Sequence, residues 1–463
     1  MPSAARKPLL PHISPAKAAA ALVLALGGGA EAACAQGAAK TGEGFELSGT
    51  NRTRLETIAG QARAGFNSRD ELLNLRTTVL AEYTSGPVRL AAELWDSRVY
   101  GGNRGSPVTP NEVNTFELVQ AFVEFKAHEP VDDGSAAAVQ AGRFMLNLGS
   151  RRLVAADDYR NTTNGYTGLH GVISGTGGWM ATLIYTLPQL RRPEALDDLL
   201  DNDVKVDRES FGLVLWGGMF SKARALGPVT AETSFFHLGE RDSGTRRTRD
   251  RSLNTAAVRL FREPKAGGWD VEIEGIAQRG HVSASLADTA PRQPVRAWFL
   301  HADVGYTFAG RWQPRVSIDY DHASGDGRGT RFGRFDTLFG MRRADLAPAG
   351  LYNAIARTNL ITPGVRVQAV PDKRTDWFVS YRPMWLASRF DSFSSTGVRD
   401  PFGRSGRFAG HQIDARIRYR LSSAVRLEAD AVVLAKGRFL RDAPNAPPRD
   451  WTRYVSLNVM TSF

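Results

Sequence analysis

Arginines occupy alternate positions in one short segment, where Arg416, Arg418 and Arg420 are separated by Ile417 and Tyr419. Residues two apart lie on the same face of an extended strand. A guanidinium group stays charged at physiological pH and binds a carboxylate through two parallel hydrogen bonds. Rings of Arg or Lys side chains are also a common means by which pores select anions. The pattern therefore indicates a face that could bind or guide carboxylates.

Other segments with the same alternation also carry arginines on their polar face. These positions are Arg76, Arg89, Arg143, Arg315, Arg366, Arg382, Arg416, Arg418 and Arg426. Acidic residues such as Glu124, Asp303 and Glu428 share these faces. An arginine beside such an acid could equally form a salt bridge that braces the structure, and for each single arginine the sequence leaves both interpretations open.

Two connecting segments are basic as well. Arg151 and Arg152 follow one predicted strand, whereas Arg342 and Arg343 lie in the longest connection, at about 324–360. Connections this long are usually functional or disordered. For the first segment we weigh a basic mouth against a solvated loop held by its own hydrogen bonds. The second could fold inward as a constriction.

The acidic residues and histidines offer weaker chemistry. Asp197, Asp201 and Asp203 could collect a calcium ion, but their spacing matches no EF-hand, and an exposed acidic loop is the alternative. The histidines are scattered, without a Gly-x-Ser-x-Gly motif or a zinc-type pair. A barrel hydrolase would need only a rim serine beside His301 or His322. We expect no cofactor and no enzymatic activity.

Strands must position these side chains, and the end of the chain shows their pattern most clearly. From Trp451 to Phe463 a largely apolar set alternates with small polar residues, without any turn. About ten such residues suffice for a tilted strand to cross a bilayer. Eighteen alternating segments are predicted, at 45–56, 70–83, 87–98, 114–127, 137–149, 167–176, 177–188, 209–220, 228–240, 250–262, 268–280, 295–308, 313–323, 361–370, 374–386, 408–421, 424–436 and 451–463.

The connections between these segments follow a rule. Those after even-numbered segments are mostly tight, and those after odd-numbered ones are long, as expected for short periplasmic turns and long outer loops. An even number of strands also closes into a barrel without open edges. An arginine facing lipid at mid-depth costs roughly 2–4 kcal/mol, so Arg416 and Arg418 should face the interior. The sequence predicts an all-β fold, an antiparallel transmembrane barrel of eighteen strands.

The N-terminal segment has the features of a cleaved signal peptide. Arg6, Lys7 and Lys17 precede an apolar stretch at 18–26. The small residues Ala33-Cys34-Ala35 then form a suitable cleavage site before Gln36. We therefore expect a signal peptide at 1–35 and one barrel domain at 36–463. The formal net charge of +11 suggests an anionic partner.

Several segments resemble one known family. They are Gly142-Arg143-Phe144, the runs 147–154 and 159–164, Phe335 to Gly340, and Arg366 after Pro363-Gly364. Over nearly its whole mature length the chain resembles the alginate export family of outer-membrane barrels. The resemblance implies a monomeric eighteen-stranded pore whose basic lumen passes an anionic polyuronate. Loops would narrow its openings, and diffusion or a periplasmic secretion scaffold would drive transport.

We therefore expect a passive channel in the bacterial outer membrane that exports an anionic, alginate-like polysaccharide. Its expected partners are that polysaccharide and outer-membrane lipid, with no nucleic acid. Arg143, Arg366, Arg416 and Arg418 are the predicted path, because the first two lie in family-like segments and the last two form the densest interior run. The alternatives are an anion-selective uptake porin for small organic acids or oligouronates, and a barrel enzyme acting on lipid or glycan.

Overall fold

The computed structural model describes residues 43–157, 159–243, 246–342 and 345–463, and it contains all eighteen predicted strands. The predicted signal peptide lies outside these ranges. The first nine strands are β1 (Gly44–Ala59), β2 (Arg69–Ser85), β3 (Val88–Tyr100), β4 (Asn114–His128), β5 (Ala136–Phe144), β6 (Tyr166–Gly175), β7 (Trp179–Pro188), β8 (Leu213–Leu226) and β9 (Val229–Glu240). The others are β10 (Ser252–Arg262), β11 (Gly268–Ser283), β12 (Arg292–Thr307), β13 (Arg315–Ala323), β14 (Leu360–Ala369), β15 (Thr375–Trp385), β16 (Phe408–Arg420), β17 (Val425–Lys436) and β18 (Trp451–Ser462).

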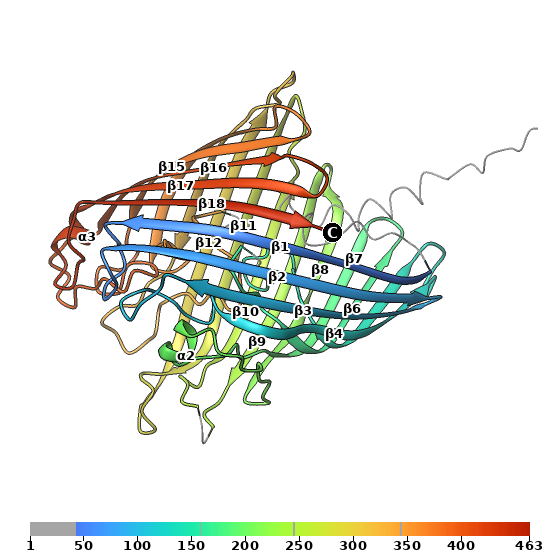
Figure 1. Cartoon of the computed structure of the whole chain (residues 1–463), viewed down its shortest axis with the longest axis horizontal. Helices are drawn as coiled ribbons and strands as arrows, with labels where there is room; N and C mark the ends of the chain where they lie inside the picture. The colour runs from blue at the N-terminus through green and yellow to red at the C-terminus, as the bar shows by residue number, and fades with distance from the viewer. Residues whose placement is uncertain (1–42, 158, 244–245, 343–344) are drawn as a thin grey trace, which may run out of the picture.

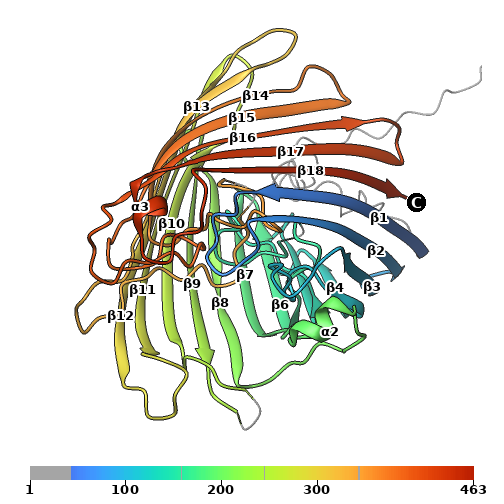
Figure 2. The same cartoon turned by 60° about the vertical axis from the view of Figure 1, so that its left-hand side comes forward.

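The strands form one closed antiparallel sheet. Each strand pairs with its neighbours in sequence, and β1 pairs with β18, with Thr50 opposite Ser462 and Ala59 opposite Arg453. Figures 1 and 2 show the blue β1 beside the red β18. Closure leaves no strand edge unpaired, as a bilayer requires, because no water is available there to satisfy backbone groups.

Burial alternates along the strands with the predicted parity. In β18, Thr452, Tyr454 and Ser456 are buried, whereas Val455 and Leu457 are exposed. In β16 the same alternation turns Arg416 and Arg418 toward the interior, with Ile417 exposed between them. The exposed apolar side chains form the lipid-facing surface, and the polar ones line the lumen. The predicted register is confirmed at these positions.

Three strand boundaries were predicted wrongly by four residues or more. The eighth strand was expected to end at residue 220, but β8 continues to Leu226. The fifth strand was expected to continue to residue 149, but β5 ends at Phe144, and the chain then turns at 148–151, where Arg151 N donates to Leu148 O at 2.9 Å. The eighth was expected to begin at residue 209, but β8 begins at Leu213, after a turn in which Leu213 N donates to Ser210 O at 2.9 Å. At both points the chain forms a local turn outside the sheet.

The long connections, including those at 145–165 and 324–359, lie at one end of the barrel, and the turns lie at the other. Two short helices, α2 (Leu196–Leu200) and α3 (Arg438–Asp442), lie in two of the long connections. Among the described residues, no helix is both long and apolar enough to cross a membrane. The long-loop end is the outer end, following the rule for barrels of this type.

Inserted loops fill part of the barrel. Leu346, Leu351, Tyr352 and Ile355 of the 324–359 loop are at most 1% exposed and belong to the apolar core. Because an ordinary porin lumen is polar and wet, this packed apolar segment shows that the loop occupies the interior as a folded element. The fold therefore places loop residues, and not only wall residues, along any path through the barrel.

Candidate functional site

The 145–165 loop crosses the lumen and is held at one side by arginines of β1. Arg54 Nη2 donates to Tyr159 O at 2.7 Å, and Arg52 Nη1 donates to the same carbonyl at 3.2 Å. Tyr159 Oη contacts the Asp430 carboxylate of β17 at 3.2 Å. The loop thus contacts wall strands that are far from its own strands, β5 and β6, around the barrel.

The other side of the same loop ends in an ion cluster centred on Arg152. Its guanidinium contacts Glu274 of β11 at 2.6 Å and Asp345 of the 324–359 loop at 2.8 Å, and it also pairs with Glu272. Arg357 pairs with Asp345 as well. Burial alone would raise the pKa of Asp345, but the guanidiniums of Arg152 and Arg357 hold that pKa well below its ordinary value. We call these five residues the Arg152 cluster.

The two inserted loops form one unit. Val154 and Phe339 make a parallel bridge between the 145–165 and 324–359 loops. The second loop also contacts the wall, because Tyr352 Oη donates to Gln412 Oε1 at 2.6 Å and Arg382 Nη2 donates to Asp345 O at 2.8 Å. Together the loops narrow the outer half of the lumen.

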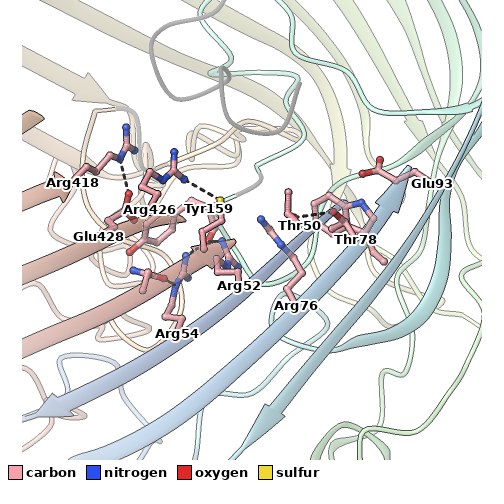
Figure 3. A pocket seen from close by; sticks show the side chains of 13 residues that line it. Thr50, Arg52, Arg54, Arg76, Thr78, Glu93, Tyr159, Arg418, Arg426 and Glu428 are labelled. Atoms are coloured by element: carbon pink, nitrogen blue, oxygen red, sulfur yellow. Dashed lines mark hydrogen bonds and ion pairs between the residues drawn. The ribbon is translucent and has the colours of Figure 1, made fainter. Parts of the chain in front are cut away.

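A cavity lies between this loop unit and the periplasmic end of the barrel (Figure 3). We call it the arginine cavity. Its lining residues are Thr50, Arg52, Arg54, Arg76, Thr78, Glu93, Trp95, Tyr159, Arg418, Arg426, Glu428, Asn458 and Met460. Five arginines face two glutamates here, a formal excess of three positive charges.

Neutral groups hold several of these guanidiniums. Arg54 Nε donates to Asn458 Oδ1 at 2.6 Å, and its guanidinium carbon lies 4.3 Å from the centre of the Tyr159 ring. The Arg76 guanidinium lies 4.6 Å from the centre of the Trp95 ring. Cation–π contacts of this kind orient a guanidinium without neutralising its charge. The cavity therefore keeps a positive potential while its side chains remain fixed.

Comparison with known proteins identifies the chain. The family model described as "Alginate export" matches residues 46–451. The chain belongs to the alginate export family. An alginate export family barrel is a channel protein of the bacterial outer membrane, which agrees with the closed eighteen-stranded sheet and its apolar outer surface.

Solved structures share the fold at low sequence identity. OccD3 (OpdP) of Pseudomonas aeruginosa has 12% identity and a TM-score of 0.55, covering 92% of this chain and 93% of that chain. OccK2 (OpdF) of the same organism, solved in complex with glucuronate, has 12% identity and a TM-score of 0.56, covering 92% and 99%. A BenF-like porin from Pseudomonas fluorescens Pf-5 has 13% identity and a TM-score of 0.55, covering 91% and 98%. No curated protein matches the chain.

The predicted path residues of this alginate export family barrel lie in two separate places. Arg418 lines the arginine cavity and contacts Glu428 at 2.6 Å. Arg366 and Arg416 stand near it on the wall, on either side of the Phe378 ring, at 3.8 and 5.0 Å from its centre. These three arginines form a connected basic wall.

Arg143, the fourth predicted path residue, is held elsewhere. It contacts Glu117 at 2.7 Å and Glu209 at 2.6 Å, so it corresponds to the salt-bridge interpretation that the sequence left open. Its two acids come from β4 and from the 189–212 loop. Arg143 therefore ties that loop to the wall, away from the arginine cavity.

The basic loop residues are buried in contacts and do not form an open mouth. Arg151 is 7% exposed, and its Nε donates to Asn147 Oδ1 at 3.1 Å. Arg152 is the centre of the ion cluster described above. Arg342 donates to Asn353, and burial, followed by the repulsion of Arg160, lowers the pKa of Arg342 to about 10. Arg343 lies outside the described residues.

The acidic residues proposed as calcium ligands are engaged in ion pairs or stand apart. Asp197 contacts Arg104 at 2.8 Å, and Asp203 lies 3.9 Å from Lys205. Asp201 caps the short helix α2 through its backbone. Within the part of the chain that the structure describes, no three His, Cys, Asp or Glu side chains are placed to hold a metal ion. This geometry gives the calcium site no support.

Arg52 and Arg54, which line the arginine cavity, were not predicted as site residues, although the alternation of β1 places both in the lumen. Ser48, Thr50, Arg52, Arg54 and Glu56 share one face of β1 in strict alternation. Arg76 was assigned to the interior but not to the path, and it is the register partner of Arg52. The role of Tyr159 could not be read, because it depends on how its loop folds across the barrel.

The 189–212 loop carries a buried carboxyl group beside another acid. Asn114 Nδ2 donates to Asp207 Oδ2 at 3.0 Å, and Asp207 N donates to Glu117 Oε2 at 2.7 Å. Burial, followed by the charge of Glu117, raises the pKa of Asp207 to about 7. In an undocked loop this carboxyl would ionise near pH 4. The docked loop is therefore favoured at low pH and destabilised as the pH rises through 7.

We predict that the 189–212 loop loosens between pH 5 and pH 8. Hydrogen exchange of its amides, corrected for intrinsic rates, should accelerate over this range, and Asp207→Asn should flatten the change. The 386–407 loop provides an internal control. Hydrogen bonds from Ser405 and its neighbours outweigh burial and lower the pKa of Asp400 to about 2, so that carboxyl stays ionised throughout. Equal acceleration in both loops would contradict the assignment.

We also predict that Arg152→Met separates the two inserted loops. Removing one partner from a buried ion cluster costs about 3–5 kcal/mol, because the remaining carboxylates lose their compensating charge. Single-channel conductance should rise, and the 145–165 loop should become sensitive to protease. Arg315→Met is the matched control, since Arg315 pairs with Asp270 and Asp303 of the wall strands β11 and β12, outside the Arg152 cluster. Unchanged conductance in Arg152→Met would argue against a loop unit held by this cluster.

Proposed function

We propose that this barrel is a passive channel that exports an anionic polysaccharide, an alginate-like polyuronate, through the arginine-lined lumen. The arginine cavity carries the proposal: five guanidiniums against two carboxylates, on the periplasmic side of the inserted loops, in a chain of the alginate export family. This is the side from which an exported polymer would enter.

Charge explains why such a cavity suits a polyuronate. The polymer bears one carboxylate per sugar, and a narrow lumen of low dielectric would exclude it through desolvation alone. Fixed guanidiniums offset that cost, and each can bind a carboxylate through paired hydrogen bonds. Arg54 and Arg426 are well suited to this role, because Asn458 and the Met460 sulfur contact them without removing their charge.

Movement along the path is favoured by a series of sites and not by one tight site. Conduction requires binding that is strong enough for entry and weak enough for exit. From the cavity, Arg416 and Arg366 continue the basic wall across β16 and β14, and Asp376 reduces the charge beside Arg416 at 3.2 Å. Such a graded wall would let a polyanion pass from one guanidinium to the next, driven by diffusion or by a periplasmic scaffold.

A second candidate is uptake of small organic anions or oligouronates. The observation that favours it is the pair of inserted loops, because the packed residues Leu351 and Tyr352 lie inside the barrel and narrow the outer half of the lumen. The two candidates differ in how block depends on chain length. A polymer exporter should be blocked more strongly as the polyuronate lengthens, whereas a small-anion porin should respond equally to monomers.

The proposal predicts anion selectivity that depends on Arg426. Its only described hydrogen bond is from Nη2 to Met460 Sδ at 3.3 Å, so a change here removes charge with little structural loss. In purified protein in planar bilayers, Arg426→Glu should shift the reversal potential toward cations. Block by polyuronate should weaken on the order of tenfold or more, since a hydrogen bond to a charged group contributes about 1.5–3 kcal/mol.

Arg453→Glu makes the same charge change on the outer surface and should leave both quantities unchanged, because Arg453 is exposed and faces away from the lumen. A wild-type channel that prefers cations, or one that polyuronates of any length fail to block, would refute the proposed function.

A further inference from the structure

A row of polar side chains crosses the outer surface of the barrel near its outer end. Trp216, His237, Asn254, Arg279 and Arg296 are successive register partners on β8, β9, β10, β11 and β12. His237 Nδ1 and Asn254 Oδ1 lie 2.8 Å apart, and the Trp216 and His237 rings lie 5.3 Å apart. The register therefore places two arginines side by side at one end of a continuous polar row.

Both arginines face away from the lumen. Arg279 is exposed, whereas its neighbour Gln278 is 1% exposed and donates to Asp336 O, inside the barrel, at 2.7 Å. Arg296 is exposed between the buried residues Val295 and Ala297. Since side chains alternate across a strand, both guanidiniums lie on the outer surface of the barrel.

The next row toward the bilayer is apolar. It consists of Phe235, Ala256, Ala277 and Trp298, which are again register partners on consecutive strands. Phe235 and Trp298 are 41% and 42% exposed. Tryptophan at such a boundary is typical of the membrane interface. The arginine pair therefore lies one row above the apolar band, at the depth of the lipid head groups.

Two arginines placed opposite each other repel. Directly opposed side chains have Cβ atoms about 4.5–5.5 Å apart, and like charges at this distance are destabilising. Among the described residues neither Arg279 nor Arg296 forms an ion pair, and the outward neighbours Asn254, Ala277 and Trp298 are uncharged. An anion from outside the chain would relieve the repulsion.

We propose that Arg279 and Arg296 bind a phosphate group of the phosphorylated glycolipid that forms the outer leaflet. Paired guanidinium forks match a phosphate in charge and geometry. The position selects lipid and not solute, because the pair faces away from the lumen and stands directly above an apolar row that can contact acyl chains. Trp298 and Phe235 supply that contact, and the Trp216–His237 pair continues the polar row along the head groups.

This site is independent of the transported solute. It lies on β11 and β12 outside the barrel, whereas the arginine cavity is lined from inside by residues of the first three and last three strands and by Tyr159. Its role would be to fix the depth and orientation of this wall in the outer leaflet.

The test measures binding of lipid A to the purified full-length barrel in detergent micelles, by the shift in thermal unfolding across a lipid titration. The double variant Arg279→Gln/Arg296→Gln should raise the apparent Kd about tenfold or more. The charge-conserving variant Arg279→Lys/Arg296→Lys should fall between the two, because the charge remains but the paired hydrogen bonds are lost. Folding of each variant is checked by its heat-modifiable migration on a gel.

Arg453→Gln is the matched control. Arg453 is also an exposed arginine near the outer end, but its register partners are Ala59 and Val433, so no arginine lies opposite it. Its Kd should equal that of the wild type. Lipid A without phosphates should bind no better to the wild type than to the double variant. Equal binding of dephosphorylated lipid A, an unchanged Kd in the double variant, or a full stabilising effect of inorganic phosphate alone would each overturn the proposal.

Discussion

The rest of this structure depends on one constraint, the absence of water within the bilayer. Backbone groups must then be paired all the way round, which β1 and β18 achieve by closing the sheet. Charged side chains must face inward over the membrane depth, because an outward Arg costs roughly 2–4 kcal/mol at the midplane. The lumen consequently collects most of the charge at membrane depth, and these charges brace the interior and line the proposed path.

The collected arginines serve two purposes, and their partners distinguish them. Arg143, Arg152 and Arg315 each contact two or more carboxylates, and they hold loops or strands in place. Arg54 and Arg426 are held by amide, aromatic, carbonyl or sulfur groups, which leave their positive charge in place along the proposed path. Ion pairs therefore brace the barrel around Arg143, Arg152 and Arg315, whereas the arginine cavity carries a net positive charge.

Strand number, parity and the inward direction of Arg416 and Arg418 were predictable, because each follows from alternation over about ten residues. The inserted loops were not predictable in detail. Arg54 and Asn458 are 404 positions apart in the sequence, and Arg152 and Asp345 are 193 positions apart. No local sequence pattern can predict contacts between residues so far apart. The end of β5 was predicted wrongly for the same reason, because it depends on contacts with residues far away in the sequence. Residues 145–149 keep an alternating appearance, yet the chain leaves the sheet there to enter the lumen.

Alternation along the strands places most charged side chains in the lumen, so the few arginines on the outer face, such as Arg279 and Arg296, need a separate explanation. An arginine on the outer face destabilises the barrel unless it lies at the membrane interface, where the free-energy cost of facing lipid falls toward zero. Two arginines placed directly opposite each other also repel, and apolar surroundings do not screen that repulsion. Arg279 and Arg296 meet both conditions above the row that contains Trp298. The same guanidinium chemistry thus serves both proposals, on different parts of the barrel: carboxylates of a solute inside β1–β3 and β16–β18, and phosphates of the leaflet outside β11 and β12.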